Sequence, residues 1–122
     1  MYKHTVTYKD FDDNERTETL YFNLTATEFS DLQLSKDGGL AEYWQKIIDA
    51  NDGGLIMDAF KDLILAAYGE KSDDGRFFMK NDEIKNRFKC SAAYNAYMME
   101  LVQNESLLQE FADNIVPKEA RA

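Results

Sequence analysis

The chain opens with two segments in which apolar and polar side chains alternate, residues 2–8 and residues 16–24. A period of two with β-branched and aromatic residues is typical of strands. The run Asp10–Asn14 between them is rich in turn-forming residues. We therefore expect an antiparallel hairpin over residues 1–24, packed through one face on helices, because two strands alone are marginally stable. The residues that share one face of each predicted strand are Tyr2, His4, Val6 and Tyr8 in the first segment and Glu18, Leu20, Phe22 and Leu24 in the second.

From Thr25 onward the apolar spacing changes to the 3.6-residue period of helices. Thr25 and Glu28 have the spacing of a capping box, in which each side chain satisfies a backbone N–H of the first turn. The predicted helices run from Thr25 to about Leu34, over about 40–50, 55–68, 81–89 and 91–103, and from Asn104 until Pro117 stops the last one.

Helix boundaries are marked by residues that cap or break helices. We expect N-caps at Asn81, Ser91 and Asn104, breaks at Gly38-Gly39 and at 51–54, and a C-cap at Gly69. The residues expected to face inward are Phe29 and Leu32; Leu40, Tyr43, Trp44, Ile47 and Ile48; Ile56, Phe60, Leu63, Ile64 and Ala67; and Leu107, Leu108, Phe111, Ala112 and Ile115.

Residues 69–80 form the longest polar connection and close with Phe77-Phe78-Met79, which is expected either to pair briefly as a strand or to plug the core. No repeat or linker divides the chain. The predicted fold is α+β, a single domain over 1–122 with a hairpin (1–24) packed on a bundle of about five or six helices (25–117) and a tail (118–122).

Composition narrows the class of protein. The chain has 122 residues, 14 Lys+Arg, 23 Asp+Glu and a formal net charge of −9, which argues against binding nucleic acid through its phosphates. A single cysteine excludes a disulfide framework. No apolar run reaches the roughly 18 residues that a membrane span needs, and no signal-peptide core is present, so we expect neither membrane nor export.

The sequence contains little evidence for catalytic residues or for a metal site, and we expect no cofactor. His4 is the only histidine, and no spacing places a carboxylate or a nucleophile beside it, so we expect a partly buried strand residue. Cys90 is expected to be a buried or half-buried thiol. A calcium-binding loop needs acidic ligands at fixed positions, glycine at position six and glutamate at position twelve. Neither a loop with Gly75 at position six nor a loop that starts at Asp10 has these residues. We therefore expect a protein that is not an enzyme.

Two features remain as binding candidates. The first is an adaptable Tyr/Met surface formed by Tyr94, Tyr97, Met98 and Met99, with Phe77 and Phe78 second. Core packing is the default interpretation of such a stripe, because Tyr94, Tyr97, Met98, Leu101 and Val102 follow helical spacing, and Met99 points off that face. The second is the segment 76–89, where five basic residues face only Asp82 and Glu83. It is either a solvated helix face or a dock for an acidic partner, including the chain's own acidic first half.

Three ordered segments carry a family resemblance. The strand–turn–strand of residues 6–25, the stretch 68–80, and the closing series Ala93-Tyr94, Met99-Glu100-Leu101, residues 111–115 and Pro117 together resemble the tail assembly chaperones of long-tailed bacteriophages. The resemblance implies an assembly factor of the host bacterial cytoplasm. Such a factor coats the long helical tape measure protein and helps to recruit tail-tube protein around it. Self-association through an exposed hairpin edge is a further expectation.

Two other functions stay open at this point. A structural virion component, in the tail or neck, would be present in purified particles, where a chaperone would be absent. An acidic inhibitor of a host nucleic-acid-binding protein would line its carboxylates on one surface, whereas the acids here are spread along the chain.

Overall fold

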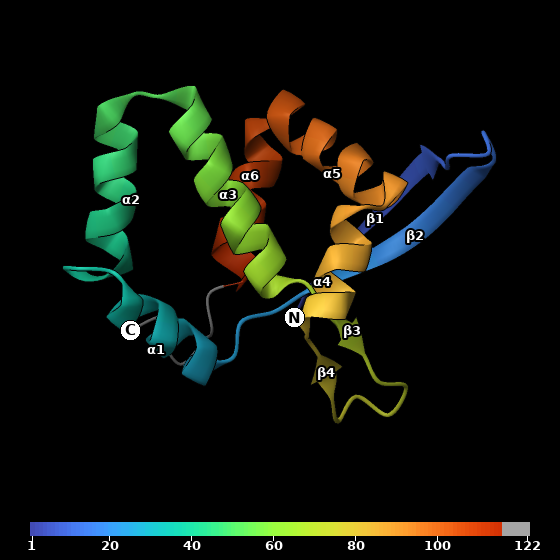
Figure 1. Cartoon of the computed structure of the whole chain (residues 1–122), viewed down its shortest axis with the longest axis horizontal. Coiled ribbons are helices and arrows are strands. Elements are labelled where there is room, and N and C mark those ends of the chain that lie inside the picture. The colour runs from blue at the N-terminus through green and yellow to red at the C-terminus, as the bar shows by residue number, and fades with distance from the viewer. Residues whose placement is uncertain (116–122) are drawn as a thin grey trace.

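The computed structural model describes residues 1–115, apart from the side chains of Ala41, Trp44, Ile48, Glu105, Leu108, Gln109 and Ala112. The predictions for Trp44, Ile48, Leu108, Ala112, Pro117 and the tail 118–122 lie outside the described residues. The predicted α+β class, a hairpin with six helices, is confirmed (Figure 1). The elements are β1 (Tyr2–Lys9), β2 (Glu15–Phe22), α1 (Ala26–Ser35), α2 (Gly39–Ala50), α3 (Gly53–Ala67), β3 (Glu70–Lys71), β4 (Phe78–Met79), α4 (Asp82–Lys89), α5 (Ala92–Gln103) and α6 (Glu105–Ile115).

The hairpin pairs β1 with β2 antiparallel, from Tyr2 opposite Phe22 to Lys9 opposite Glu15. Its outer face carries a threonine ladder, in which the hydroxyls of Thr5 and Thr19 lie 3.0 Å apart and those of Thr7 and Thr17 lie 3.1 Å apart. The predicted turn is organised by the Asp10 carboxylate, which accepts hydrogen bonds from the backbone N–H groups of Asp12 and Asn14. The Arg16 side chain also donates to Asp10.

The inner face of the hairpin packs on α5 and α6 and forms the core. Val6 and Phe22 are fully buried, and the Phe22 ring stacks on Tyr97 at 5.3 Å between centroids. Phe111 of α6 meets Phe22 edge-on, also at 5.3 Å. Such aromatic pairs add stabilisation beyond the apolar area that they bury. The strand half of the predicted core is thereby confirmed.

The end of β2 is extended by the segment that follows α3. The N–H of Asn23 donates to the carbonyl of Ala67 at 2.8 Å, and Phe22 forms an isolated antiparallel bridge with Tyr68. Gly69 does not have the left-handed backbone of an αL C-cap, so that interpretation was wrong. A Cβ at this position would lie 2.7 Å from the Phe78 ring and 2.8 Å from the Met79 carbonyl oxygen, so close approach requires the glycine.

The predicted N-caps of the helices are confirmed. Thr25 and Glu28 form both hydrogen bonds of the capping box, at 3.1 and 3.0 Å. Asn81 accepts from the N–H of Ile84, and Ser91 accepts from the N–H of Tyr94. Asn104 accepts from Ser106 in the same way. These caps could be predicted because each one depends on residues no more than three positions apart.

Helices α1 to α3 are less buried than the sequence predicted. Of the five residues expected to be buried on α3, only Ile64 and Ala67 are, whereas Ile56, Phe60 and Leu63 are half-buried; Ala59, which was not predicted, is buried. α1 has no fully buried residue. These three helices form one side of the molecule, while the far half of the hairpin extends beyond the helices on the other side (Figure 1).

Candidate partner-binding surface

The structure divides the six residues predicted to contact a partner. Tyr97 and Met98 are buried in the core, whereas Met99 on the outer side of α5 is 48% exposed. Phe77 is 53% exposed, and Tyr94 and Phe78 are half-buried. Of these six residues, only Met99 and Phe77 are exposed to a partner. The α5 stripe is therefore mainly core, as one of the two sequence interpretations had it.

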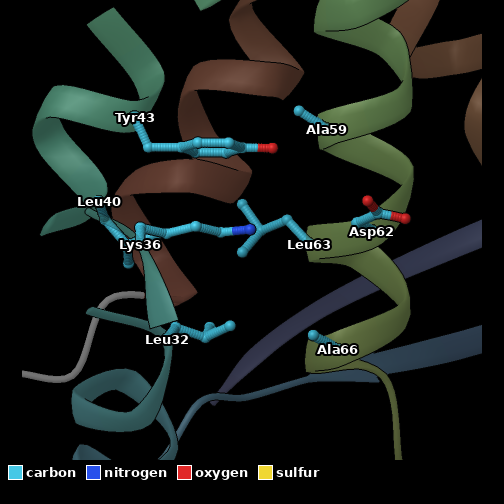
Figure 2. Close-up of a pocket in the computed structure, with 8 residues that line it drawn as sticks. All are labelled: Leu32, Lys36, Leu40, Tyr43, Ala59, Asp62, Leu63 and Ala66. Atoms are coloured by element: carbon cyan, nitrogen blue, oxygen red, sulfur yellow. The ribbon is translucent and has the colours of Figure 1, made fainter. Parts of the chain in front are cut away.

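A separate apolar groove lies between α1, α2 and α3 (Figure 2). Leu32 and Leu40 line it on one side, and Ala59, Leu63 and Ala66 of α3 line it on the other. Its volume is ≈ 70 Å³. The sequence placed Leu32, Leu40, Tyr43 and Leu63 on inward faces but did not indicate that a groove would stay open between them. Helical periodicity identifies an apolar face but not how completely its neighbours cover it.

The groove is shaped by two sharp turns. Gly38 and Gly39 both have positive φ, at 80° and 88°, which turns the chain between α1 and α2. The Gln33 side-chain carbonyl accepts from the N–H of Leu40 at 2.6 Å and joins the two helices. Asn51, at φ 51°, ends α2, and Asp52 then caps α3 by accepting from the N–H groups of Gly54 and Leu55.

The groove is lined by one positively charged side chain, Lys36, and one negatively charged side chain, Asp62. The Lys36 ammonium lies 4.3 Å from the centroid of the Tyr43 ring, a cation–π contact. In Figure 2 the Lys36 side chain crosses the groove below Tyr43 towards Leu63, and Asp62 lies on α3 to the right of Leu63. The groove thus combines an aliphatic floor with one cation and one anion, a pattern suited to an amphipathic segment.

A second, larger hollow of ≈ 560 Å³ lies between the hairpin tip and the start of α5. It is lined by Tyr8, Phe11, Cys90 and Tyr94 among others, and Phe11 is 83% exposed. Cys90 is exposed, so the expectation of a buried or half-buried thiol was wrong. Cys90 is the C-cap of α4, at the junction between α4 and α5.

Part of the basic segment 76–89 is paired within the chain. Lys80 donates to the Glu28 carboxylate at 2.8 Å and to the Asn23 carbonyl at 2.6 Å, a contact with the acidic first half of the chain that was one of the two interpretations left open by the sequence. Arg87 lies 3.3 Å from Glu70. Burial lowers the pKa of Lys80, and the Glu28 carboxylate partly offsets this. Burial also acts to raise the pKa of Glu28, but hydrogen bonds from Lys80 and Thr25 outweigh it and leave that pKa below its usual value.

The tertiary structure supplies one pair that no sequence spacing indicated. The His4 Nε2 lies 2.6 Å from the Glu100 carboxylate, across 96 positions, and the His4 ring lies 4.9 Å from Tyr97. His4 is partly buried, as predicted. Glu100 belongs to a segment that carried the family resemblance, but nothing in the sequence pointed to its partner.

Within residues 1–115, no three or more His, Cys, Asp or Glu side chains gather so that they could hold a metal ion. None of the helices in this part of the chain has the length and apolarity to cross a membrane.

The comparisons with known proteins agree with the resemblance seen in the sequence. Neither a curated protein nor a solved structure matches the chain. A family model described as phage tail assembly chaperone matches residues 1–122. Because this match covers the whole chain, the protein belongs to the phage tail assembly chaperone family.

Proposed function

We propose that the protein binds the tape measure protein in the host bacterial cytoplasm and assists assembly of the tail-tube protein around it, without catalysing a reaction. The observation that carries this proposal is membership of the tail assembly chaperone family over the full chain. A net charge of −9 supports the role, because charge keeps a complex with a long apolar partner in solution.

The groove between α1, α2 and α3 is the proposed contact surface, and its occupant is an amphipathic helix of the tape measure protein. A helix places apolar side chains every three or four residues on one face, and such a ridge fits an apolar groove between helices. Leu40 and Leu63 would contact the ridge. Lys36 and Asp62 would contact polar residues beside it.

Co-expression with the tape measure protein tests the function. The chain is expected to keep that protein in the soluble fraction and to co-purify with it. If the tape measure protein precipitates equally with and without the chain, the proposal fails. Mass spectrometry of purified virions separates a chaperone, which is absent from particles, from a structural component present at fixed stoichiometry.

Replacing single apolar residues by glutamate tests which surface contacts the tape measure protein. Leu40→Glu in the groove is expected to abolish the rescue, while Leu34→Glu is the matched control, since Leu34 is 86% exposed on α1 and does not line the groove. Met99→Glu and Phe77→Glu test the surfaces predicted from the sequence. Thermal unfolding of each variant shows whether it remains folded. Loss of rescue with Met99→Glu or Phe77→Glu, but not with Leu40→Glu, would move the contact surface away from the groove.

A further inference from the structure

The outer edge of β2 is an unpaired strand edge of defined length. The N–H of Gly69 donates to the Tyr21 carbonyl at 3.4 Å, and the N–H of Asn23 donates to Ala67, so the odd-numbered residues of β2 direct their backbone groups away from β1. Backbone groups alternate between the two edges of an antiparallel strand. Glu15, Thr17 and Thr19 therefore direct their N–H and C=O groups outward, and within residues 1–115 no other element pairs with them.

The unpaired part of the β2 edge is bounded at both ends. The turn that contains Asp13, at φ 63°, precedes Glu15, and the bridge between Phe22 and Tyr68 covers the edge beyond Thr19. The free segment Glu15–Thr19 therefore has Thr17 at its centre. All five of its residues are exposed, and this half of the hairpin extends beyond the helices in Figure 1.

We propose that a second copy of this chain pairs with this edge, β2 against β2 and antiparallel, on a twofold axis at Thr17. In that register Thr17 lies opposite Thr17 of the other copy, and Glu15 lies opposite Thr19. These pairs would form about six backbone hydrogen bonds. The two hairpins would then make one four-stranded sheet, and an isologous contact of this kind closes as a dimer.

Charge complementarity selects a second copy as the occupant. In the same register Arg16 of each copy lies opposite Glu18 of the other, and opposite charges directly across an antiparallel pair stabilise it. The Arg16 Nε contacts Asp10, and one Glu18 oxygen accepts from Tyr8, so the terminal Arg16 nitrogens and the second Glu18 oxygen remain for the partner copy.

The opposite edge of the sheet does not have this complementarity. The β1 edge carries Lys3 and Lys9, which would lie opposite each other in a self-pairing centred on Val6. Lysine on an edge strand is a common protection against such pairing, because like charges oppose it. α5 also packs along β1.

Charge exchange tests the register directly. Sedimentation of the full chain over a concentration series is expected to show a monomer–dimer equilibrium. Arg16→Glu or Glu18→Arg alone places like charges opposite each other twice, so each is expected to raise the dimer Kd about tenfold. An equimolar mixture of the two variants restores both opposite-charge pairs and is expected to recover the dimer.

Two proline variants test the edge itself. Thr17→Pro removes an outward N–H and is expected to give a folded monomer, since proline is tolerated where the N–H of an edge strand faces solvent. Thr5→Pro, at the β1 edge, is the matched control and is expected to leave the dimer intact. These measurements need no tape measure protein, so their outcome is independent of the proposed function.

Two results would overturn the proposal. The first is a chain that stays monomeric up to ~1 mM, which would leave the edge to an extended segment of another protein or to solvent. The second is a dimer that both charge variants leave unchanged, which would place the contact elsewhere on the surface.

Discussion

The ammonium of Lys80 lies 2.8 Å from the carboxylate of Glu28, across 52 positions of sequence. Glu28 also closes the capping box of α1, and Lys80 also donates to the Asn23 carbonyl. This contact joins the strand–helix junction after β2 to the polar connection that precedes α4. Lys80 is the more enclosed partner, with 11% of its side chain exposed against 38% for Glu28.

Replacing Lys80 by methionine is expected to destabilise the fold by about 1–2 kcal/mol, because the Glu28 carboxylate and the Asn23 carbonyl lose a charged donor. This range is below the usual cost for a charged hydrogen bond, since Glu28 is more than a third exposed. Urea unfolding measures the change. Lys89→Met, at an exposed position, is the control and should stay within about 0.5 kcal/mol of the parent. Equal effects of the two variants would show that the Lys80 contact adds nothing.

The same contact predicts a dependence of stability on acid. The pKa of Glu28 is lowered in the folded state, so its contribution is present above the ordinary glutamate pKa, near ~4.3, and is lost as pH falls through the folded value. Glu28→Gln keeps a group able to close the capping box but removes the charge. The stability difference between parent and variant should therefore shrink below about pH 4. A difference that stays constant from pH 7 to pH 3 would contradict this assignment.

Stability is also expected to fall in alkali. Burial, followed by the hydrogen bond to Glu18, raises the pKa of Tyr8 to about 12. Burial likewise raises the pKa values of Tyr2, Tyr68, Tyr94 and Tyr97. Above the ordinary tyrosine pKa near ~10, the unfolded chain releases protons that the folded chain retains, so unfolding becomes more favourable as pH rises. Titration of tyrosinate absorbance should show these groups ionising only with loss of structure. If every tyrosine ionised near pH ~10 while the protein stayed folded, the predicted loss of stability in alkali would be refuted.

Two glycines give opposite predictions for the same substitution. Gly69→Ala places a methyl group against Phe78 and the Met79 carbonyl and is expected to cost about 1–3 kcal/mol. Gly53→Ala, at the start of α3, meets nothing within 4 Å and is expected to stabilise by about 0.4–1 kcal/mol, because alanine restricts the unfolded chain. The midpoint of thermal unfolding, measured for Gly69→Ala and for Gly53→Ala, checks both predictions. Similar shifts for both variants would count against the close approach at Gly69.

The Cys90 thiol is expected to react in the folded protein, since it is exposed at the junction of α4 and α5. Addition of a chromogenic disulfide reagent to native protein should modify it with single-exponential kinetics, without denaturant. Cys90→Ser is the control and should give no reaction. A thiol that becomes reactive only at the rate of global unfolding would show that the site is closed.

Local patterns predicted most of the secondary structure, and the errors have identifiable causes. The antiparallel hairpin, the capping box at Thr25 and the N-caps at Asn81 and Ser91 depend on residues close in sequence. Cys90 was expected to be a buried or half-buried thiol because no histidine partner could be placed beside it, whereas the structure puts it at the C-cap of α4, where it is exposed.

The predicted contact residues were separated only by the tertiary structure. Tyr97 and Met98 share a helical stripe with Tyr94, and the stripe faces the hairpin. The same reasoning from periodicity could not distinguish the covered side of α5 from the partly open faces of α1 and α3. The groove appears only when three helices are placed relative to one another.

The sequence by itself determined the hairpin, the helices and their N-caps, and its whole-chain match identified the family. Hydrogen bonding and side-chain periodicity act over a few residues, so a linear pattern carries them. Only the tertiary structure decided which apolar faces stay uncovered, that Glu100 meets His4, and that residues 15–19 of β2 keep a free edge. These features depend on contacts between segments distant in the chain, and they are fixed by the sum of many packing interactions that no single spacing encodes.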